Sequence, residues 1–352
     1  MLILGIETSC DETSVALLEH RGGNGLEIRA NLIASQIEAH QLFGGVVPEI
    51  ASRKHLEAVN PLLRLLKEEA DLEDWRDLDL IGVTSGPGLS GALLVGVAAA
   101  KALSVSTRVA IRGVNHIKGH ICSTFLENPN LQFPMLCLVV SGGHSDLILM
   151  RDFSSFDRLG KTRDDAVGEG FDKVARAIGF PLPGGPNLER AAAKIGKTAL
   201  RYTPSNMEPS FDFSFSGLKT AATQGFKKGQ NSPEEVAFAF QTAALSQLAR
   251  QTKRALEQFQ PKTLGLCGGV ASNSALRAKM AEICGDVELV VPAPILCTDN
   301  AAMIGAAAFF EARDQNFPAF SVEDLGFEAR SVWPIDFDRG GKEGGGREEK
   351  KS

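Results

Sequence analysis

A unit of strand, polar turn and strand occurs twice in this sequence, and this recurrence most limits the folds open to the chain. The first copy covers residues 2–18 and has a turn of acidic and hydroxyl side chains at 7–13. The second covers residues 135–150, with a turn at 141–145. Strand, glycine-turn and helix signals follow both copies, so each one opens a long α/β segment. The sequence therefore predicts an internally duplicated α/β architecture with two related halves.

Helix and strand signals after each copy support this division. Ser232 and Pro233 are typical of the cap and the first residue of a helix, which then runs to residue 259. A buried strand at 80–84 leads through a glycine turn into a helix, as in a doubly wound unit. The patterns predict helices over 55–70, 91–105, 233–259 and 301–312, and strands over 80–84, 263–267 and 287–291.

Composition excludes several classes of protein. The 352 residues are 43% hydrophobic and 23% charged with a net charge of −6, which is typical of a soluble globular protein and argues against nucleic-acid binding by bulk positive charge. The six cysteines include no CxxC pair, which favours reduced thiols and a cytoplasmic location. The longest apolar stretch, 88–100, is shorter than the roughly 20 residues that span a bilayer. Residues 340–352 are rich in glycine and charge, so we expect a disordered tail.

Two histidines, His116 and His120, stand four residues apart. On a helix this spacing places both imidazoles on one face, where they can share a metal ion; an ordinary solvated helix face is an equal alternative. The glutamate of the HExxH motif of metalloendopeptidases is absent, because Ile117, Lys118 and Gly119 fill the gap. The general base of that reaction is therefore missing.

Asp299 precedes a helix of small residues. This position favours a helix N-cap. As a metal ligand, Asp299 would complete a set of two histidines and one carboxylate, which suits iron and can also hold zinc. One carboxylate oxygen suffices for each role, so the two are compatible.

Polar turns supply candidate substrate contacts. Asp11 lies in the first turn, placed either to handle a proton or phosphate-bound metal or to sit at a solvated hairpin tip. The turn at 141–144 offers backbone N–H groups and an imidazole, and its two glycines can take positive φ. Residues 268–273 form a strand-to-helix junction typical of a nucleoside or phosphate cradle. Asp172 is expected at a helix start, where a ribose contact competes with a surface salt bridge.

Seven motifs occur in order along the chain and together carry a resemblance. They are IETSCDET at 6–13, GGVVPE at 44–49, HIKGH at 116–120, VSGGH at 140–144, FSFSGLKT at 213–220, GGVASN at 268–273 and CTDNAAMIG at 297–305. With these motifs, residues 1–335 closely resemble the bacterial tRNA N6-adenosine threonylcarbamoyltransferase family, TsaD.

The resemblance implies an ASKHA fold, the duplicated α/β architecture of actin, Hsp70 chaperones and sugar kinases, with two RNase H-like lobes around a central cleft. On this basis we expect one lobe at 1–130 and the other at 131–299. A C-terminal helix at 300–325 is expected to pack back on the first lobe.

The resemblance also implies site residues. The metal ligands map to His116, His120 and Asp299, which would hold one divalent metal, with Fe²⁺ preferred to Zn²⁺. The family's adenylate contacts map to Val140, Ser141, Gly142, Gly143, His144, Asp172, Gly185 and Asn273, and Glu189 falls where some members have a ribose-binding acid. The adenylate is threonylcarbamoyl-AMP, and ATP or ADP is an alternative occupant of the same site.

The reaction implied by the resemblance transfers the threonylcarbamoyl group from threonylcarbamoyl-AMP to N6 of adenosine 37 in tRNAs that read ANN codons, and releases AMP. Its expected partners are tRNA, the paralogous subunit TsaB, the ATPase TsaE and the adenylate synthase TsaC. Our hypothesis for Asp11 is that it acts as the general base or orients the amine. An ASKHA-type kinase and a non-catalytic scaffold are the alternatives. The paired imidazoles speak against a kinase, because kinases hold Mg²⁺ through carboxylates and phosphates.

Overall fold

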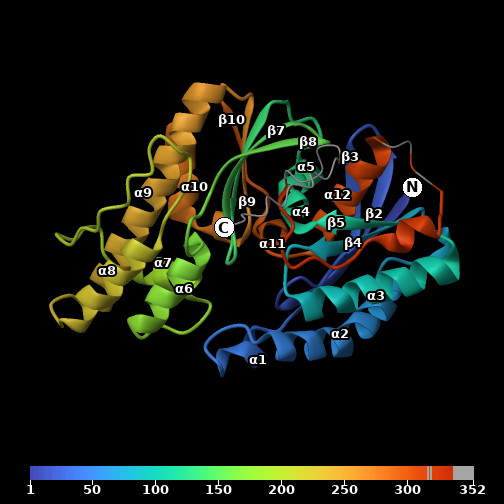
Figure 1. Cartoon of the computed structure of the whole chain (residues 1–352), viewed down its shortest axis with the longest axis horizontal. Coiled ribbons are helices and arrows are strands. Elements are labelled where there is room, and N and C mark those ends of the chain that lie inside the picture. The colour runs from blue at the N-terminus through green and yellow to red at the C-terminus, as the bar shows by residue number, and fades with distance from the viewer. Residues whose placement is uncertain (315–316, 318, 336–352) are drawn as a thin grey trace, which may run out of the picture.

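Two sheets of identical topology form the framework of the molecule (Figure 1). The computed structural model describes residues 1–314, 317 and 319–335, so the predicted tail at 340–352 lies outside the described residues. Within this part, the first sheet has the order β3-β2-β1-β4-β5 and the second has the order β8-β7-β6-β9-β10. In each, an antiparallel three-strand meander is extended by two parallel strands beside its first member. The predicted duplication is confirmed.

The strands are β1 (Leu2–Glu7), β2 (Glu12–Gly22), β3 (Gly25–Ser35), β4 (Leu80–Gly86), β5 (Ala110–Asn115), β6 (Met135–Val140), β7 (Ser145–Asp152), β8 (Ser155–Lys161), β9 (Thr263–Cys267) and β10 (Glu288–Val290). The helices are α1 (Ile37–Gln41), α2 (Pro48–Glu69), α3 (Ser90–Thr107), α4 (His116–Cys122), α5 (Thr124–Glu127), α6 (Val167–Ala177), α7 (Gly184–Ala193), α8 (Ser216–Lys227), α9 (Pro233–Phe259), α10 (Ser274–Cys284), α11 (Pro294–Cys297) and α12 (Ala301–Asp314). Three short 3₁₀ turns complete the assigned elements: η1 (Trp75–Asp77), η2 (Gly269–Ser272) and η3 (Glu323–Gly326).

Helices cover both faces of each sheet, and one group lies between the sheets. The pair α2 and α3 packs on the outer face of the first sheet, while α12 and α4 pack on its inner face. Alternate residues of β6 then point to opposite sides: Cys137 and Val139 join the core around α4 and α12, and Leu136 and Leu138 join the core under α6–α10. The two halves therefore share one apolar core along α4 and α12.

Close approach to the first sheet explains why α12 carries small residues such as Ala301 and Ala308 where it meets β1 and β4. A Cβ atom on Gly5 would lie 2.0 Å from the carbonyl oxygen of Ala301, and one on Gly82 would lie 2.5 Å from Cβ of Ala308. The first sheet thus accepts this helix only because its contacting strands carry glycine there. The helix ends at Asp314, and residues 319–322 are not helical, so it is shorter than the predicted segment 300–325.

Replacing Gly5 by alanine is expected to destabilise the fold by about 1–3 kcal/mol or more, because the clash is with backbone atoms that cannot rotate away. The midpoint of denaturant unfolding measures this loss. Gly196→Ala is the matched control: Gly196 is exposed and an added Cβ would meet nothing within 4 Å. Equal midpoints for the two variants would contradict the packing described here.

Candidate metal centre and the adjoining turns

Helix α4 presents the two histidines of the HIKGH motif to the interior. It begins directly after β5, where the Asn115 side chain accepts hydrogen bonds from the backbone N–H groups of Ile117 at 2.9 Å and Lys118 at 3.3 Å. This cap fixes the first turn of the helix. His116 and His120 then lie one turn apart, and both are buried, at 5% and 0% exposure. The predicted helical spacing is confirmed, and the solvated-face alternative is wrong.

Asp299 reaches the same place from the start of α12. The sequence favoured Asp299 as the cap of this helix, but the side chain of Asn300 fills that role by accepting a hydrogen bond from the backbone N–H of Met303 at 3.1 Å. The preference for Asp299 as the cap was wrong by one residue. Its carboxylate is therefore directed to the histidines instead, and it stays 23% exposed.

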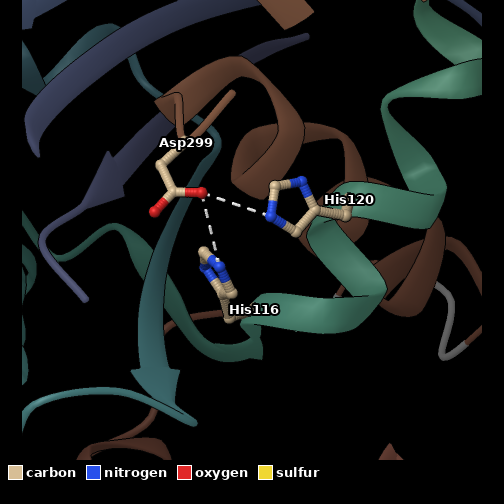
Figure 2. Close-up of side chains that lie close together, drawn as sticks. All are labelled: His116, His120 and Asp299. Atoms are coloured by element: carbon tan, nitrogen blue, oxygen red, sulfur yellow. Dashed lines mark ion pairs between the residues drawn. The ribbon is translucent and has the colours of Figure 1, made fainter. Parts of the chain in front are cut away.

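One carboxylate oxygen faces both imidazoles (Figure 2). Oδ1 of Asp299 lies 3.2 Å from Nε2 of His120 and 3.6 Å from Nε2 of His116, and the three candidate ligand atoms all lie within 4.8 Å of one another. In a tetrahedral site with bonds of about 2.0–2.1 Å, adjacent ligand atoms are about 3.3–3.4 Å apart. The two oxygen–nitrogen separations match that spacing.

The state of His120 shows that these residues fit a metal. Among the described residues neither ring nitrogen has a hydrogen-bond partner, although the side chain is completely buried. The contact with Asp299 is close enough for an ion pair, but its alignment is not that of a hydrogen bond. A buried polar group without a partner costs about 1–3 kcal/mol. A metal ion bound at Nε2 would remove the part of this penalty that falls on Nε2, because a lone pair pointing at the ion needs no proton.

Glu7, at the end of β1, supports His116 from behind. Its Oε2 lies 3.2 Å from Nδ1 of His116 and also accepts from the Thr84 hydroxyl, while its Oε1 accepts from the backbone N–H of Ser9 at 2.5 Å. The carboxylate is fully buried. A carboxylate that accepts the Nδ1 proton leaves Nε2 free to bind a metal and fixes the orientation of the ring. The sequence alone gives no role to Glu7, because its partners come from elements distant in the chain.

Charges in this group act strongly on each other. Burial opposes the charged form of His116, but the Asp299 and Glu7 carboxylates outweigh it and raise the pKa of this histidine to about 9. Burial lowers the pKa of His120. Burial raises the pKa of both Glu7 and Asp299, but the combined attraction and hydrogen bonds of neighbouring groups, with His116 the strongest, outweigh it and hold both pKa values below their usual range. The site is therefore built to keep two carboxylates ionised in the interior.

Glu7→Gln is expected to weaken metal binding by about 10–100-fold, since the substitution keeps the size of the side chain but removes the charge that orients His116. Competition with a chelator of known affinity measures the change. Glu57→Gln, on the exposed side of α2, is the control and should bind metal like the wild type. An unchanged affinity in Glu7→Gln would show that the ring is held without Glu7.

The turn between β1 and β2 places two further carboxyls beside the candidate metal group, which is His116, His120 and Asp299. Burial raises the pKa of Asp11, and the nearby Asp299 carboxylate adds to the rise. Burial also raises the pKa of Glu12 to about 8, with Asp299 again contributing. Among the described residues Oε2 of Glu12 is buried without a hydrogen-bond partner. Asp11 is half-buried, so it is not at a solvated hairpin tip.

The turn at 141–144 faces this group from the second sheet. The ring centroids of His144 and His116 are 6.3 Å apart. Burial and the neighbouring histidines lower the pKa of His144 to about 3, so it is a neutral donor and acceptor beside the metal group. Neither glycine of this turn has positive φ, contrary to the expectation, and both are exposed with open space around them.

Asp172 and Gly185 are joined by a short bridge between helices. Asp172 lies in the middle of α6, so its expected place at a helix start was wrong. Its carboxylate accepts a hydrogen bond from the backbone N–H of Gly184 at 2.7 Å and another from Gly185. Asp172 thereby occupies the N–H groups at the start of α7. Its neighbour Lys173 pairs with Asp165 and Glu169 as a surface ion pair.

The remaining predicted contacts lie at the junction of η2 and α10. The Asn273 side chain accepts from the backbone N–H of Leu276 at 2.9 Å and donates to Gln241 at 3.1 Å, so it caps α10. Glu189 accepts from the backbone N–H of Ser274 at 2.7 Å. These bonds bring α7 and α10 together at the carboxyl end of β9.

Backbone contacts connect this junction to the turn after β6. A Cβ on Gly268 would lie 2.4 Å from the carbonyl oxygen of Val140, and one on Gly168 would lie 2.5 Å from that of Ser141. The turn at 141–144 and the junction at 268–273 therefore meet at the carboxyl ends of β6 and β9, which is where ligands bind in open α/β sheets.

Comparison with known proteins gives consistent matches along the chain. A family model for tRNA N6-adenosine threonylcarbamoyltransferase, TsaD, matches residues 27–306. The tRNA N6-adenosine threonylcarbamoyltransferase of Halalkalibacterium halodurans is 48% identical over 329 residues, which cover 91% of this chain and 94% of that protein. The protein of the same name from Clostridium botulinum is 47% identical over 317 residues, covering 88% and 92%.

Solved structures support the fold. HypF from T. kodakarensis superposes with a TM-score of 0.62 at 14% identity, over 92% of this chain and 49% of HypF. The chain thus spans about half the length of HypF. At this identity the similarity bears on the fold alone, which is ASKHA-like, with two related α/β halves.

Proposed function

Because the chain belongs to the tRNA N6-adenosine threonylcarbamoyltransferase family, and so is a transferase that modifies tRNA, we propose that its donor is threonylcarbamoyl-AMP and its acceptor is N6 of adenosine 37 in tRNAs that read ANN codons. In this reaction the carbonyl carbon forms a bond to N6 while its bond to the phosphate oxygen breaks. AMP leaves, and the amine loses a proton. ATP or ADP can occupy the adenylate site in place of the donor.

The observation that carries the proposal is the group of His116, His120 and Asp299, backed by Glu7 and flanked by the Asp11 turn. When bound there, a divalent metal would supply Lewis-acid stabilisation of developing negative charge. Fe²⁺ is our preferred occupant and Zn²⁺ the alternative, since two imidazoles and one carboxylate suit either ion.

The chain's own residues would handle the proton and the two substrates. Asp11 accepts the N6 proton or orients the amine for attack. The backbone N–H groups of Gly142 and Gly143 and the neutral imidazole of His144 hydrogen-bond to oxygens of the adenylate, while the N–H groups of Ser141 and His144 close the turn by bonding to each other's residues. Val140, Asp172, Gly185, Glu189 and Asn273 shape the nucleoside pocket. For Asp172 and Asn273 the role is indirect, since their side chains hold the starts of α7 and α10.

The negative net charge of the chain bears on how it would bind tRNA. A chain with a net charge of −6 needs local basic surface or other proteins to hold a polyanion such as tRNA. We propose that TsaB and TsaE join this chain in the cytoplasm and that TsaC supplies the adenylate. We also propose that residues 1–130 and 131–299 form the two lobes, and that α12 packs back on the first lobe. In the described part of the chain α3 is the one helix long and apolar enough to cross a membrane, but it packs on α2 and β4.

Reconstitution tests this proposal. The chain is combined with its three protein partners, unmodified tRNA, threonine, bicarbonate and ATP, and the modified nucleoside is measured by mass spectrometry of digested tRNA. We expect threonylcarbamoyladenosine at position 37 of ANN-reading tRNAs only. If tRNA stays unmodified when a known family member is active under the same conditions, the proposed donor and acceptor are wrong for this chain.

A further inference from the structure

A buried polar network lies beneath the turn that carries Asp11. Four polar side chains are almost completely enclosed between β2, α1 and α2, with exposures of 0% for Thr13, 6% for Gln36, 3% for His40 and 0% for His55. None of them belongs to the metal group or to the predicted substrate contacts. Buried polar networks are costly unless every member is satisfied, so this one calls for an explanation.

The hydrogen bonds of this network have a single consistent direction. Nε2 of His55 lies 3.0 Å from the carbonyl oxygen of Cys10, and since a carbonyl can only accept, Nε2 carries the proton. In a neutral ring Nδ1 then accepts, and it receives the Thr13 hydroxyl at 2.8 Å and the Gln36 amide nitrogen at 3.3 Å. Burial lowers the pKa of His55, which agrees with a neutral ring.

The direction continues through the second histidine. With its nitrogen used as a donor, the Gln36 amide presents Oε1 to Nε2 of His40 at 3.2 Å. Nδ1 of His40 then accepts from the backbone N–H of Val47 at 3.3 Å. Both imidazoles are thus assigned as neutral and protonated at Nε2, and the chain of donors runs from Val47 to the Cys10 carbonyl.

At its inner end the network fixes both peptide groups next to Asp11. His55 holds the carbonyl of the Cys10–Asp11 peptide, and the backbone N–H of Gln36 donates to the carbonyl of Asp11 at 3.0 Å. Restraining the peptides on both sides of a residue restrains its φ and ψ, and so the direction in which its side chain leaves the backbone.

At its outer end the network meets the contact between the two halves. Gln41 donates to the carbonyl oxygen of Leu182 at 2.9 Å, and Arg176 donates to that of Gly44 at 2.7 Å. Arg176 lies on α6, and Leu182 lies just before α7, the two helices that Asp172 bridges. The segment that starts the donor chain is therefore the one that touches the predicted substrate side of the second half (Figure 1).

We propose that His55, with Gln36 and His40, is a positioning network that sets the direction of the Asp11 carboxylate and ties it to the contact between the halves. The proposal rests on the proposed role of Asp11 in transfer. His55 touches neither substrate nor metal group, so it acts only through the Asp11 turn.

Two substitutions at His55 separate positioning from general stability. His55→Leu removes the donor to Cys10, whereas His55→Gln keeps a nitrogen donor at the place of Nε2. In the reconstituted complex with synthetic threonylcarbamoyl-AMP and tRNA, we expect kcat of His55→Leu to fall by as much as about 10²-fold with KM for the adenylate unchanged, because a misplacement of about 1 Å can cost that much. His55→Gln should recover most of the rate, and His20→Leu, a histidine outside the network, should match the wild type.

Asp11→Ala, measured in parallel, distinguishes failure of the proposed role of Asp11 from failure of the positioning network. If Asp11→Ala has the wild-type rate of transfer, Asp11 has no role in the reaction. The network then cannot contribute to catalysis by positioning Asp11. If Asp11→Ala is inactive while His55→Leu has wild-type kcat, or while the Leu and Gln variants are equally impaired, the network alone is overturned.

A measurement on the unmodified protein covers the case in which His55→Leu does not fold. Nitrogen-15 NMR of the imidazoles reports charge and tautomer directly. We expect His55 to be neutral with its proton on Nε2 at pH 7. A charged ring, or a proton on Nδ1, would overturn the assignment on which the network depends.

Discussion

The His120→Ala protein is expected to purify without stoichiometric metal and to lose transfer activity by about 10³-fold, because several kcal/mol of charge stabilisation would be lost at about 1.4 kcal/mol for each tenfold change in rate. Replacing His120 disturbs fewer neighbouring interactions than replacing His116. It contacts Asp299 but not Glu7, so the buried pair of Glu7 and His116 stays intact. Its removal also leaves no buried charge without a partner.

Metal content by mass spectrometry, after anaerobic purification with Fe²⁺ or Zn²⁺ supplied, is the direct measurement. The same preparations are then assayed for threonylcarbamoyladenosine. His20→Ala serves as the matched control, since His20 packs at a tilt against Phe309 and is not one of the three candidate ligands. One metal ion per chain in His120→Ala would show that the ion binds elsewhere.

The second large effect is expected at Asp11. Asp11→Ala should lower the rate of transfer by about 10²–10⁴-fold, the usual contribution of a positioned general base, and leave adenylate binding unchanged. The binding should persist because the predicted adenylate contacts lie on the second half, around β6 and β9.

Single-turnover transfer and calorimetric binding of ADP, measured on the same preparations, separate the two effects. Glu57→Ala, an exposed carboxylate on α2, is the control for loss of an acidic residue. A parallel loss of transfer and ADP binding in Asp11→Ala would assign the residue to the nucleotide pocket instead of the proton transfer.

Elements with local signals could be predicted from the sequence. The long helix α9 begins and ends as expected, because Ser232 and Pro233 mark its start and Glu235 completes the capping box. The helix predicted from residue 55 is seven residues longer at its start, since α2 begins at Pro48. There the cue was Pro48 at the first helical position, which the apolar pattern alone does not show.

The candidate site was predictable only in part. The spacing of His116 and His120 is a local property of one helix, and so it could be read from the sequence. Glu7 and His55 could not be identified in this way, because their partners lie across sheets and helices and only the folded chain brings them together. The choice between Asp299 and Asn300 as the cap of α12 likewise depends on a distant element, because Asp299 faces the histidines of α4 and leaves Asn300 to cap the helix.

The position of α12 has a consequence for how the protein is made. This helix covers the inner face of the first sheet, and Ala301 at its start donates to the hydroxyl of Ser14 on β2. A ribosome therefore synthesises β1–β5 long before their cover exists, although chains tend to fold from the N-terminus as they emerge. Until α12 has been made, the inner apolar face of the first sheet lacks this cover. His116 and His120 likewise lack Asp299 until residue 299 has been translated. We therefore expect any metal held by these three residues to bind late in synthesis, after residue 299 has been made.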